Sequence, residues 1–266
     1  MIIYPRAKLN LGLNIVEKRE DGYHNLETVF YPIDIHDTLE VVESDHLSLS
    51  LSGVPLEGDT NNNLVVRAWL LLQKGHPLPP VDIRLYKAIP SQAGLGGGSS
   101  DGAFMLRLLN EMFQLNISQE ELCEKAAMLG ADCPIFILDA PAYAEGIGEQ
   151  LTPIDLDLSR YHLLIVKPPI AVSTREAFAH IIPRPTTIKC REIVQQDICT
   201  WRDALRNDFE DSIFPQYPRL RRIKEQLYHH GALYAAMSGS GSSLYGFFEE
   251  DPVILDEWKD CYVKVI

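Results

Sequence analysis

The chain has 266 residues, of which 46 % are hydrophobic and 23 % charged, so it can bury a substantial core and is neither disordered nor fibrous. Its formal net charge of −13 at pH 7 argues against nucleic-acid binding, because phosphate backbones require clustered Lys and Arg. Five cysteines without a C-x-x-C pair indicate neither a disulfide framework nor a zinc ribbon, and favour a reducing cytoplasm. The sequence shows no signal peptide and no uncharged stretch of transmembrane length, so we expect no membrane partner.

Strands and helices alternate in the first part of the chain. Alternating apolar residues indicate strands, and apolar residues at helical spacing after an N-cap indicate a helix. The patterns predict, in order, a strand over 7–16, a tight turn at 21–22, strands within 38–51 interrupted near 44–45, a helix from 64 to about 75 capped within Asn61-Asn62-Asn63, and a strand over 81–85.

The segment from Pro90 to Ser100 breaks this periodicity and is predicted to be a loop. Apolar residues at 105, 108, 109 and 112 then indicate an amphipathic helix directly behind it. Glycine occupies positions 94, 96, 97 and 98, which lets backbone N–H groups face a ligand, and the helix N-terminus adds attraction for an anion. The hydroxyls of Ser99 and Ser100 could bind phosphate oxygens or magnesium. The alternative is a flexible surface loop.

Two familiar nucleotide-binding loops are excluded by spacing. A Walker loop ends in Gly-Lys-Ser/Thr, whereas Gly98 is followed by serine. A dinucleotide fingerprint that starts at Gly94 would require glycine at position 99, which is Ser99. The loop therefore predicts an anion site of another kind.

The remainder of the chain is also mixed, so we predict the α+β class. Ser118 and Glu121 form a capping box for a helix that ends at Gly130, and Pro134 prevents its simple continuation. Beyond it, an apolar run over 163–166 precedes Pro168-Pro169, and the sequence then predicts helices over 174–181, 201–205 and 220–228, strands over 233–237 and 244–248, and a glycine turn over 238–242 between these two strands.

Three segments together resemble the GHMP kinases, the superfamily of galactokinase, homoserine kinase and mevalonate kinase. Residues 90–100 resemble the second motif, 237–243 the third, and 7–14 with 19–24 the first motif of one branch; 130–134 and 207–210 also match. The resemblance implies two domains, a nucleotide-binding domain over 1–154 and an α/β sandwich domain over 155–266, with the active site in the cleft between them. One residue departs from the pattern, because Asp101 stands where the family usually has Asn.

The resemblance also implies an ATP-dependent small-molecule kinase. In the branch with this first motif, the acceptor is the 2-hydroxyl of a methylerythritol that carries a cytidine diphosphate group, in the non-mevalonate route to isoprenoid precursors. ATP is then the phosphoryl donor, with Mg²⁺ bound mainly through the nucleotide.

The catalytic pair that the resemblance implies is Asp132 and Lys8. Asp132 would accept the proton of the acceptor hydroxyl, and Lys8 would keep Asp132 ionised and offset charge on the phosphoryl group. From the spacing alone, Asp132 is an ordinary turn residue and Lys8 a surface lysine.

The implied binding residues fall into an ATP set and a substrate set. Tyr23 and His24 would recognise the cytosine, with Phe178 as the opposing ring, although Phe178 also fits a helix core face. Asn63 and Lys87, assigned to the adenine side, fit equally well as a helix cap and a solvated lysine, and Gly239-Ser240-Gly241 as a hairpin turn. The ATP set is Pro90, Ser91, Gln92, Ala93, Gly94, Leu95, Gly96, Gly97, Gly98, Ser99, Ser100, Asn63 and Lys87; the substrate set is Asn10, Tyr23, His24, Thr174, Phe178, Gly239, Ser240 and Gly241.

Two other functions stay open on the sequence. One is a GHMP kinase that acts on homoserine or mevalonate, although such small acceptors would not need Tyr23, His24 and Phe178. The other is a non-catalytic nucleotide-binding regulator, against which the presence of both Lys8 and Asp132 argues.

Overall fold

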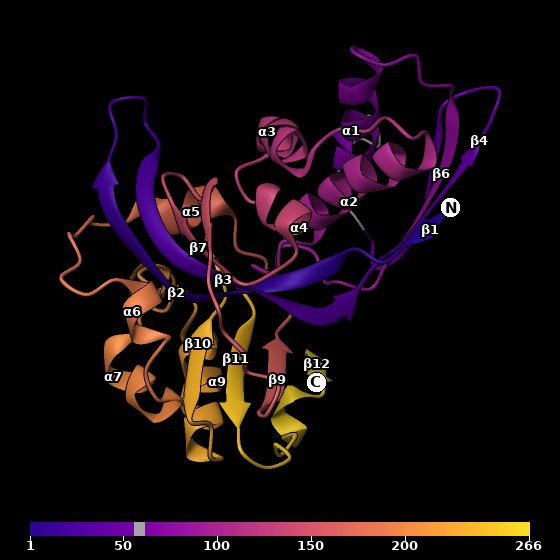
Figure 1. Cartoon of the computed structure of the whole chain (residues 1–266). Helices are drawn as coiled ribbons and strands as arrows, with labels where there is room; N and C mark the ends of the chain where they lie inside the picture. Colours follow the sequence, from indigo (N-terminus) through magenta and orange to yellow (C-terminus); the bar gives the residue numbers. More distant parts are fainter. Residues whose placement is uncertain (56–61) are drawn as a thin grey trace. The chain divides into compact units, whose positions relative to one another are not determined.

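The computed structural model describes residues 1–55 and 62–266, which form two compact units that interleave along the chain (Figure 1). Unit 1 comprises residues 1–8, 32–91 and 96–140, and unit 2 comprises residues 9–31, 92–95 and 141–266. The boundary of family domains at residue 154 stays a prediction.

In its described residues, unit 1 combines one sheet with the helices α1 to α4. The sheet has the order β1-β4-β6-β5, in which β5 runs parallel to β6 and the other pairs are antiparallel. Helix α1 packs along α2, and α3 contacts both α2 and α4. The elements are β1 (Ile2–Ile3), β4 (Thr38–Glu43), β5 (Ser48–Gly53), α1 (Leu64–Gln73), β6 (Val81–Lys87), α2 (Gly97–Met112), α3 (Gln119–Leu129) and α4 (Pro134–Leu138).

Two of the predicted helix starts of unit 1, those of α1 and α3, are confirmed by their caps. The side chain of Asn63 accepts a hydrogen bond from the Val65 N–H at 3.1 Å, and Ser118 Oγ accepts one from the Glu121 N–H at 3.2 Å. Asn61, the first of the three predicted cap residues, lies outside the described residues. Each cap satisfies one of the backbone donors that a helix N-terminus leaves without an intrahelical partner.

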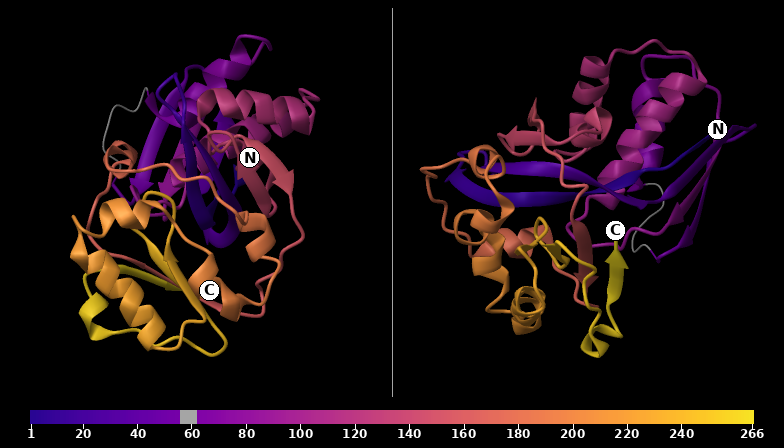
Figure 2. Two further views of the ribbon diagram at one scale, coloured as in Figure 1. Left: turned by 90° about the vertical axis from the view of Figure 1, so that its left-hand side faces the viewer. Right: turned by 60° about the horizontal axis from the view of Figure 1, so that its bottom comes forward.

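Unit 2 contains two antiparallel sheets. One has the order β2-β3-β7-β8 and the other β10-β11-β9-β12, in which β12 is an edge strand that carries the C-terminus (Figure 2). Unit 2 includes residues 9–18 of β2 and 24–31 of β3. The strands are β2 (Arg6–Lys18), β3 (His24–His36), β7 (Ala142–Glu145), β8 (Gln150–Pro153), β9 (His162–Lys167), β10 (Tyr234–Met237), β11 (Leu244–Phe248) and β12 (Tyr262–Val265).

The helices of unit 2 are short except for α9, which packs against β10 and β11. The apolar faces of α5, α8 and α9 meet the second sheet in one core, to which Leu164, Ile213, Leu227 and Met237 belong. The helices are α5 (Thr174–Ala179), α6 (Cys190–Ile193), η2 (Ile198–Thr200), α7 (Trp201–Ala204), α8 (Phe209–Ile213), α9 (Pro218–His229) and η3 (Asp256–Trp258).

The α+β class is confirmed, and the prediction was incomplete in two respects. The elements β1, β3, β7, β8, β9, β12, α4, α6, α8, η2 and η3 were not predicted, and α2 begins at Gly97, so the last four residues of the predicted loop are helical. Glycine at positions 97 and 98 concealed this start, because helix propensity disfavours it. Within the described parts of the chain, no helix is both long and apolar enough to cross a membrane.

Candidate functional site

The four glycines of the loop differ in whether the structure requires glycine at their positions. Gly94 and Gly96 adopt φ of 72° and 73°, in the left-handed region that favours glycine, and a Cβ on Gly97 would lie 2.9 Å from Ile89 Cγ2. Gly98 needs glycine for neither reason, because its φ is not positive and, apart from adjacent residues and the backbone of α2 itself, no described atom lies within 4 Å of the position of a Cβ. Backbone at the N-terminus of α2 is therefore bare at Gly98, where an anion could approach the N–H groups.

The two serines after the glycines face different surroundings. Ser100 is fully buried, and its hydroxyl donates to the Arg6 carbonyl oxygen at 2.7 Å. Ser99 is partly exposed and lies beside the buried Cys133 thiol, whose pKa burial raises to about 12. Ser100 thus ties the start of α2 to β2, and Ser99 is the serine with an accessible side chain.

Lys8 and Asp132 form an ion pair in unit 1. Lys8 Nζ lies 3.4 Å from Asp132 Oδ2, and the Lys8 side chain is 3 % exposed whereas that of Asp132 is 41 % exposed. Asp132 occupies the turn between α3 and α4, which the Cys133 N–H closes by donating to the Gly130 carbonyl at 3.0 Å. Burial lowers the pKa of Lys8, and the negative charge of Asp132 opposes that shift. The pair therefore combines a buried cation with a carboxylate that solvent or a substrate can reach.

Lys87 lies in a second, fully buried cluster, which we call the triad and which consists of Asp37, Lys87 and Asp101. Lys87 Nζ donates to Asp37 Oδ2 and, at 2.5 Å, to Asp101 Oδ2. Asp37 Oδ1 also accepts from the backbone N–H groups of Ala88 and Ile89 at 2.6 and 2.9 Å. The expected alternative of a solvated Lys87 is wrong, because all three side chains are at most 3 % exposed.

The triad has one cation for two carboxylates, and their environments differ. Asp37 is saturated with donors, whereas Asp101 Oδ1 is buried without a hydrogen-bond partner among the described residues. Burial raises the pKa of Asp101 to about 8, and the negative charge of Asp37 adds to this shift against the opposing effect of Lys87. We therefore expect Asp101 to retain a proton near neutral pH, which avoids a net buried negative charge.

The aromatic residues predicted to recognise cytosine lie in unit 2. His24 and Phe178 stack directly on each other, with ring centroids 4.8 Å apart and an interplanar angle of 19°. A base inserted between them would need two contacts of roughly 3.5 Å each, so the rings would have to separate. Burial lowers the pKa of His24, which keeps its ring neutral, while Tyr23 is 61 % exposed and free to stack on a base. Thr174 is exposed at the start of α5.

Asn10 and the second glycine turn also belong to unit 2. The Asn10 side chain donates to Thr28 Oγ1 at 3.1 Å, and its backbone N–H donates to Ser238 Oγ at 3.3 Å. Ser238 Oγ in turn donates to the Gly94 carbonyl at 2.8 Å. Gly239 and Gly241 have φ of 52° and 88°, so this turn requires glycine. The hydrogen bond from Ser238 thereby joins Gly94, in the first glycine loop, to the glycine turn over 239–241.

The structure groups the predicted residues by unit. Unit 1 brings together Lys8, Asp132 and the start of α2, and unit 2 brings together Asn10, Gly94 and the turn over 239–241, and separately His24 and Phe178. The remaining loop residues are Pro90, Ala93 and Leu95, which are buried, Ser91, which is partly buried, and Gln92, which is exposed with φ of 47°.

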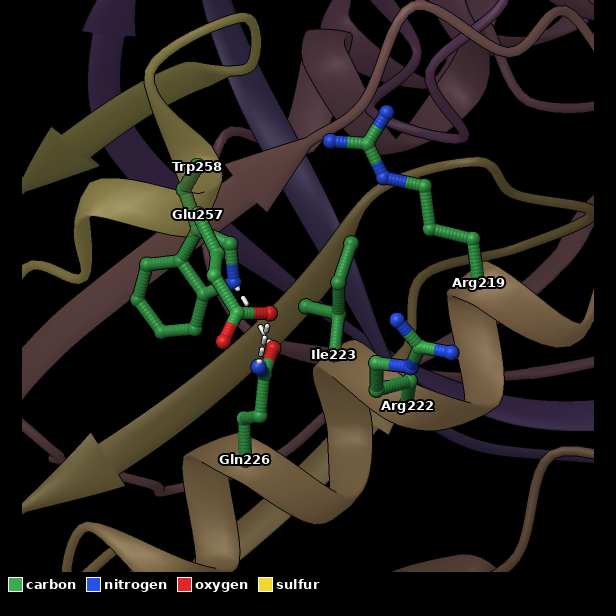
Figure 3. A pocket seen from close by; sticks show the side chains of 6 residues that line it. All are labelled: Arg219, Arg222, Ile223, Gln226, Glu257 and Trp258. Atoms are coloured by element: carbon green, nitrogen blue, oxygen red, sulfur yellow. Dashed lines mark hydrogen bonds between the residues drawn. The ribbon is translucent and has the colours of Figure 1, made fainter.

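A shallow pocket of about 350 Å³ on α9 contains none of the predicted residues (Figure 3). Two hydrogen bonds join side chains of its lining: Trp258 Nε1 donates to Gln226 Oε1, and Gln226 Nε2 donates to Glu257 Oε2, each at 2.9 Å. Its lining residues are Arg219, Arg222, Ile223, Gln226, Glu257 and Trp258. The polar side chains of Gln226, Glu257 and Trp258 thus form a hydrogen-bonded network at the surface of unit 2.

Sequence reasoning missed three residues that hold the predicted site in place. Asp37 gave no signal, because a single Asp after a strand is common. Ser238 and Asn207 lie within segments that match the family, but spacing assigned no role to either. Their hydrogen bonds join positions more than 25 residues apart, which local patterns do not record.

Comparison with known proteins identifies relatives of this chain over nearly its whole length. The model of the GHMP kinases N terminal domain matches residues 63–140, and that of the GHMP kinases C terminal domain matches residues 191–264. The 4-diphosphocytidyl-2-C-methyl-D-erythritol kinase of Bacteroides fragilis is 54 % identical over 258 residues, which cover 96 % of this chain and 94 % of that protein. The enzyme of the same name from Bacteroides thetaiotaomicron is 55 % identical over 255 residues, covering 94 % and 93 %.

A solved structure shows the same fold. The crystal structure of a 4-(cytidine 5'-diphospho)-2C-methyl-D-erythritol kinase superposes with a TM-score of 0.81 at 28 % identity and covers 100 % of this chain and 98 % of that one. Identity of about half the residues over nearly full length is the stronger finding. The chain is a kinase, and it belongs to the 4-diphosphocytidyl-2-C-methyl-D-erythritol kinase family of the GHMP kinases.

Proposed function

We propose that this kinase transfers the γ-phosphoryl group of ATP to the 2-hydroxyl of 4-diphosphocytidyl-2-C-methyl-D-erythritol, giving the 2-phosphate and ADP in the non-mevalonate route to isoprenoid precursors. The observation that carries the proposal is the ion pair between buried Lys8 and accessible Asp132 in a chain whose relatives, at 54–55 % identity, have this name. The substrate is thus a small molecule with a cytidine diphosphate group. A cytoplasmic location is a further part of the proposal.

Asp132 acts as the general base in this proposal. Its carboxylate accepts the proton of the 2-hydroxyl as the oxygen attacks phosphorus, the bond from the γ-phosphorus to the bridging oxygen breaks, and ADP leaves. Lys8, 3.4 Å away, favours the ionised form of Asp132 and is placed to offset charge on the transferred group. The 41 % exposure of Asp132 supports this role, because a base must be reachable by the acceptor.

The loop from Pro90 to Ser100 binds the ATP phosphates in this proposal. The bare backbone at Gly98 supports it, since nothing else among the described residues accounts for glycine there. Mg²⁺ would be held mainly by nucleotide oxygens and would neutralise phosphate charge. The partly exposed hydroxyl of Ser99, beside the N-terminus of α2, is an oxygen donor of the kind that Mg²⁺ prefers.

On the acceptor side, Tyr23, His24 and Phe178 recognise the cytosine, with Asn10, Thr174 and the turn over 239–241 as polar and backbone contacts. The exposed ring of Tyr23 supports stacking on a base, and neutral His24 can both donate and accept a hydrogen bond. Lys87 and Asn63 stay predicted contacts of ATP. For Lys87 this requires that the ammonium be shared between the nucleotide and the triad.

The experiment is a coupled assay of ADP release with purified protein, ATP and Mg²⁺. We expect release only when 4-diphosphocytidyl-2-C-methyl-D-erythritol is added, and competition by cytidine diphosphate. Homoserine and mevalonate should give no release; release with either of them and no effect of cytidine diphosphate would replace the proposed acceptor. Binding of ATP without release with any acceptor would favour the non-catalytic regulator.

A further inference from the structure

The segment around Asn207, between α7 and α8, is fixed to strand β2. The Leu13 N–H donates to the Arg206 carbonyl at 2.7 Å, and the Asp208 N–H donates to the Leu13 carbonyl at 2.8 Å. Asp208 Oδ2 accepts from the Ile15 N–H at 2.7 Å. The backbone of Asn207 is thus held on both sides by a long strand.

The Asn207 side chain is 3 % exposed and reaches from that anchor to the second glycine turn. Its Nδ2 donates to the carbonyl oxygens of Met237 and Gly239 at 2.7 and 2.8 Å, and its Oδ1 accepts from the Phe209 N–H at 3.0 Å. Two carbonyl acceptors on one side and an N–H donor on the other match the amide in this orientation only. Both N–H groups of the amide are therefore used to hold the turn.

The same turn holds residues 92–95 of the first glycine loop. Besides the bond from Ser238 Oγ to the Gly94 carbonyl, the N–H groups of Ser242 and Ser243 donate to the carbonyls of Gln92 and Ala93 at 3.3 and 3.2 Å. A Cβ on Gly94 would collide with the Ser238 carbonyl oxygen. All of these residues belong to unit 2.

We propose that Asn207 is a positioning residue for the nucleotide-phosphate loop, acting through the turn over 237–243. Its amide sets the place of the Met237 and Gly239 carbonyls, the turn sets the place of Gln92 to Gly94, and Gly94 opens the run of glycines that leads into α2. The inference rests on the proposed function in that the loop binds ATP. Asn207 itself need not touch the nucleotide.

If Asn207 served only to end strand β10, loss of its amide would have a different effect from the one expected for a positioning residue. Glu210 Oε1 already accepts from the Met237 N–H at 2.8 Å, and β10 pairs with β11 through Met237 and Leu244. Loss of the Asn207 amide should therefore leave the strand in place and release the turn, whereas a strand-ending role would lower stability without changing the loop.

The variant Asn207→Asp tests this, because it keeps the side-chain shape and replaces both N–H donors by an oxygen that faces two carbonyls. The matched control is Asn110→Asp, since Asn110 Nδ2 donates to the Ile117 carbonyl and its Oδ1 accepts from the Ile117 N–H, each at 3.0 Å, in unit 1. We expect kcat/KM for ATP to fall roughly 10²-fold in Asn207→Asp, largely through KM, and to be unchanged in Asn110→Asp.

Hydrogen exchange measures the coupling between Asn207 and the loop directly, and the measurement needs no phosphoryl-acceptor substrate. We expect the amides of Ser242 and Ser243, whose acceptors are Gln92 and Ala93, to exchange about tenfold faster or more in Asn207→Asp and at the parental rate in Asn110→Asp. Affinity for a fluorescent ATP analogue should fall in parallel. These two readouts stand even if the acceptor proves to be a different alcohol.

Unchanged exchange at Ser242 and Ser243, or unchanged ATP affinity with a lowered Tm, would overturn the inference. If Asn207→Asp does not fold, Ser238→Ala replaces it, because this variant removes the hydrogen bond from Ser238 Oγ to Gly94, together with the acceptor of the Asn10 N–H, and leaves the Asn207 amide in place. It should weaken binding of the ATP analogue severalfold; parental affinity in Ser238→Ala would also overturn the inference.

Discussion

Unit 1 contains two lysines that are equally buried, at 2 % exposure each, and that differ in the carboxylates paired with them. The partner of Lys8 is Asp132, which is 41 % exposed, whereas Lys87 is enclosed by Asp37 and Asp101, which are at most 3 % exposed. An enclosed charge cluster contributes rigidity and its loss is costly, because removal of one partner leaves uncompensated buried charge. A half-open pair can exchange a proton with a ligand. Accessibility of the carboxylate, more than burial of the lysine, therefore distinguishes the predicted catalytic pair from the triad.

The largest effect expected is on turnover when Asp132 is changed. Asp132→Asn should lower kcat by about 10²–10⁴-fold, because the general base is lost, while the Tm changes little for a side chain so exposed. Steady-state kinetics and thermal unfolding measure the two quantities.

The matched control for Asp132→Asn is Glu121→Gln. Glu121 is 51 % exposed and lies 3.3 Å from Lys125, so it has a similar ion pair outside the predicted site. Parental kcat in Asp132→Asn would refute the base assignment and leave the kinase assignment intact.

A change in the triad should lower stability, whereas the change at Asp132 should lower turnover and leave stability nearly unchanged. Lys87→Met leaves the buried carboxylate of Asp37 without its cation beside Asp101, and we expect the free energy of unfolding to fall by about 3–5 kcal/mol. Urea unfolding measures this. Lys8→Met, the equivalent change in the half-open pair, should lose less stability and more turnover; equal losses of stability in both variants would erase the distinction between the two lysines.

Stability should also depend on pH through Asp101. Its pKa is raised from 3.8 to about 8 on folding, so the folded state binds a proton that the unfolded state has released. This contribution is fully present below the unfolded pKa and is lost as pH rises toward about 8. Thermal unfolding between pH 5 and pH 9 should show a falling Tm that is flatter in Asp101→Asn. Identical slopes would mean that Asp101 is ionised throughout.

The smallest effect is expected at the adjacent glycines Gly97 and Gly98. Gly97 is enclosed by Ile89, whereas the space beside Gly98 is open. Gly98→Ala should leave stability unchanged or raise it by up to about 0.5–1 kcal/mol, because the space around it is open, and should raise KM for ATP. Gly97→Ala should lower stability, since its Cβ would press on Ile89. An unchanged KM for ATP in Gly98→Ala would argue against phosphate at this point of the loop.

The sequence predicted the elements that have a local signal. Caps at Asn63 and Ser118 located two helices, and the glycines located the loop, but β3 was missed, because thirteen residues that run from His24 to His36 show no clean alternation. That strand is buried on both faces over Glu27 to Phe30, so the pattern of a half-buried strand does not apply.

Site residues could be predicted only where a residue of suitable chemistry lies within a segment that resembles a family motif. Lys8 and Asp132 were predicted from resemblance and do form an ion pair, whereas their roles stay predictions. Asp37 and Asn207 act through long-range hydrogen bonds, and no spacing in the chain indicates that Asp37 meets Lys87 or that Asn207 meets Gly239.

The hydrogen bonds between residues 92–95 and the turn over 237–243 constrain how the chain can be divided. A fragment that ends at the predicted domain boundary would retain the carbonyls of Gln92 and Ala93 but lose the Ser242 and Ser243 N–H groups that satisfy them. The complementary fragment would carry the turn without the backbone on which it rests. Neither half should be expressed as a substitute for the whole in nucleotide-binding work, and a split version of this kinase would recover the loop only when both pieces reassemble.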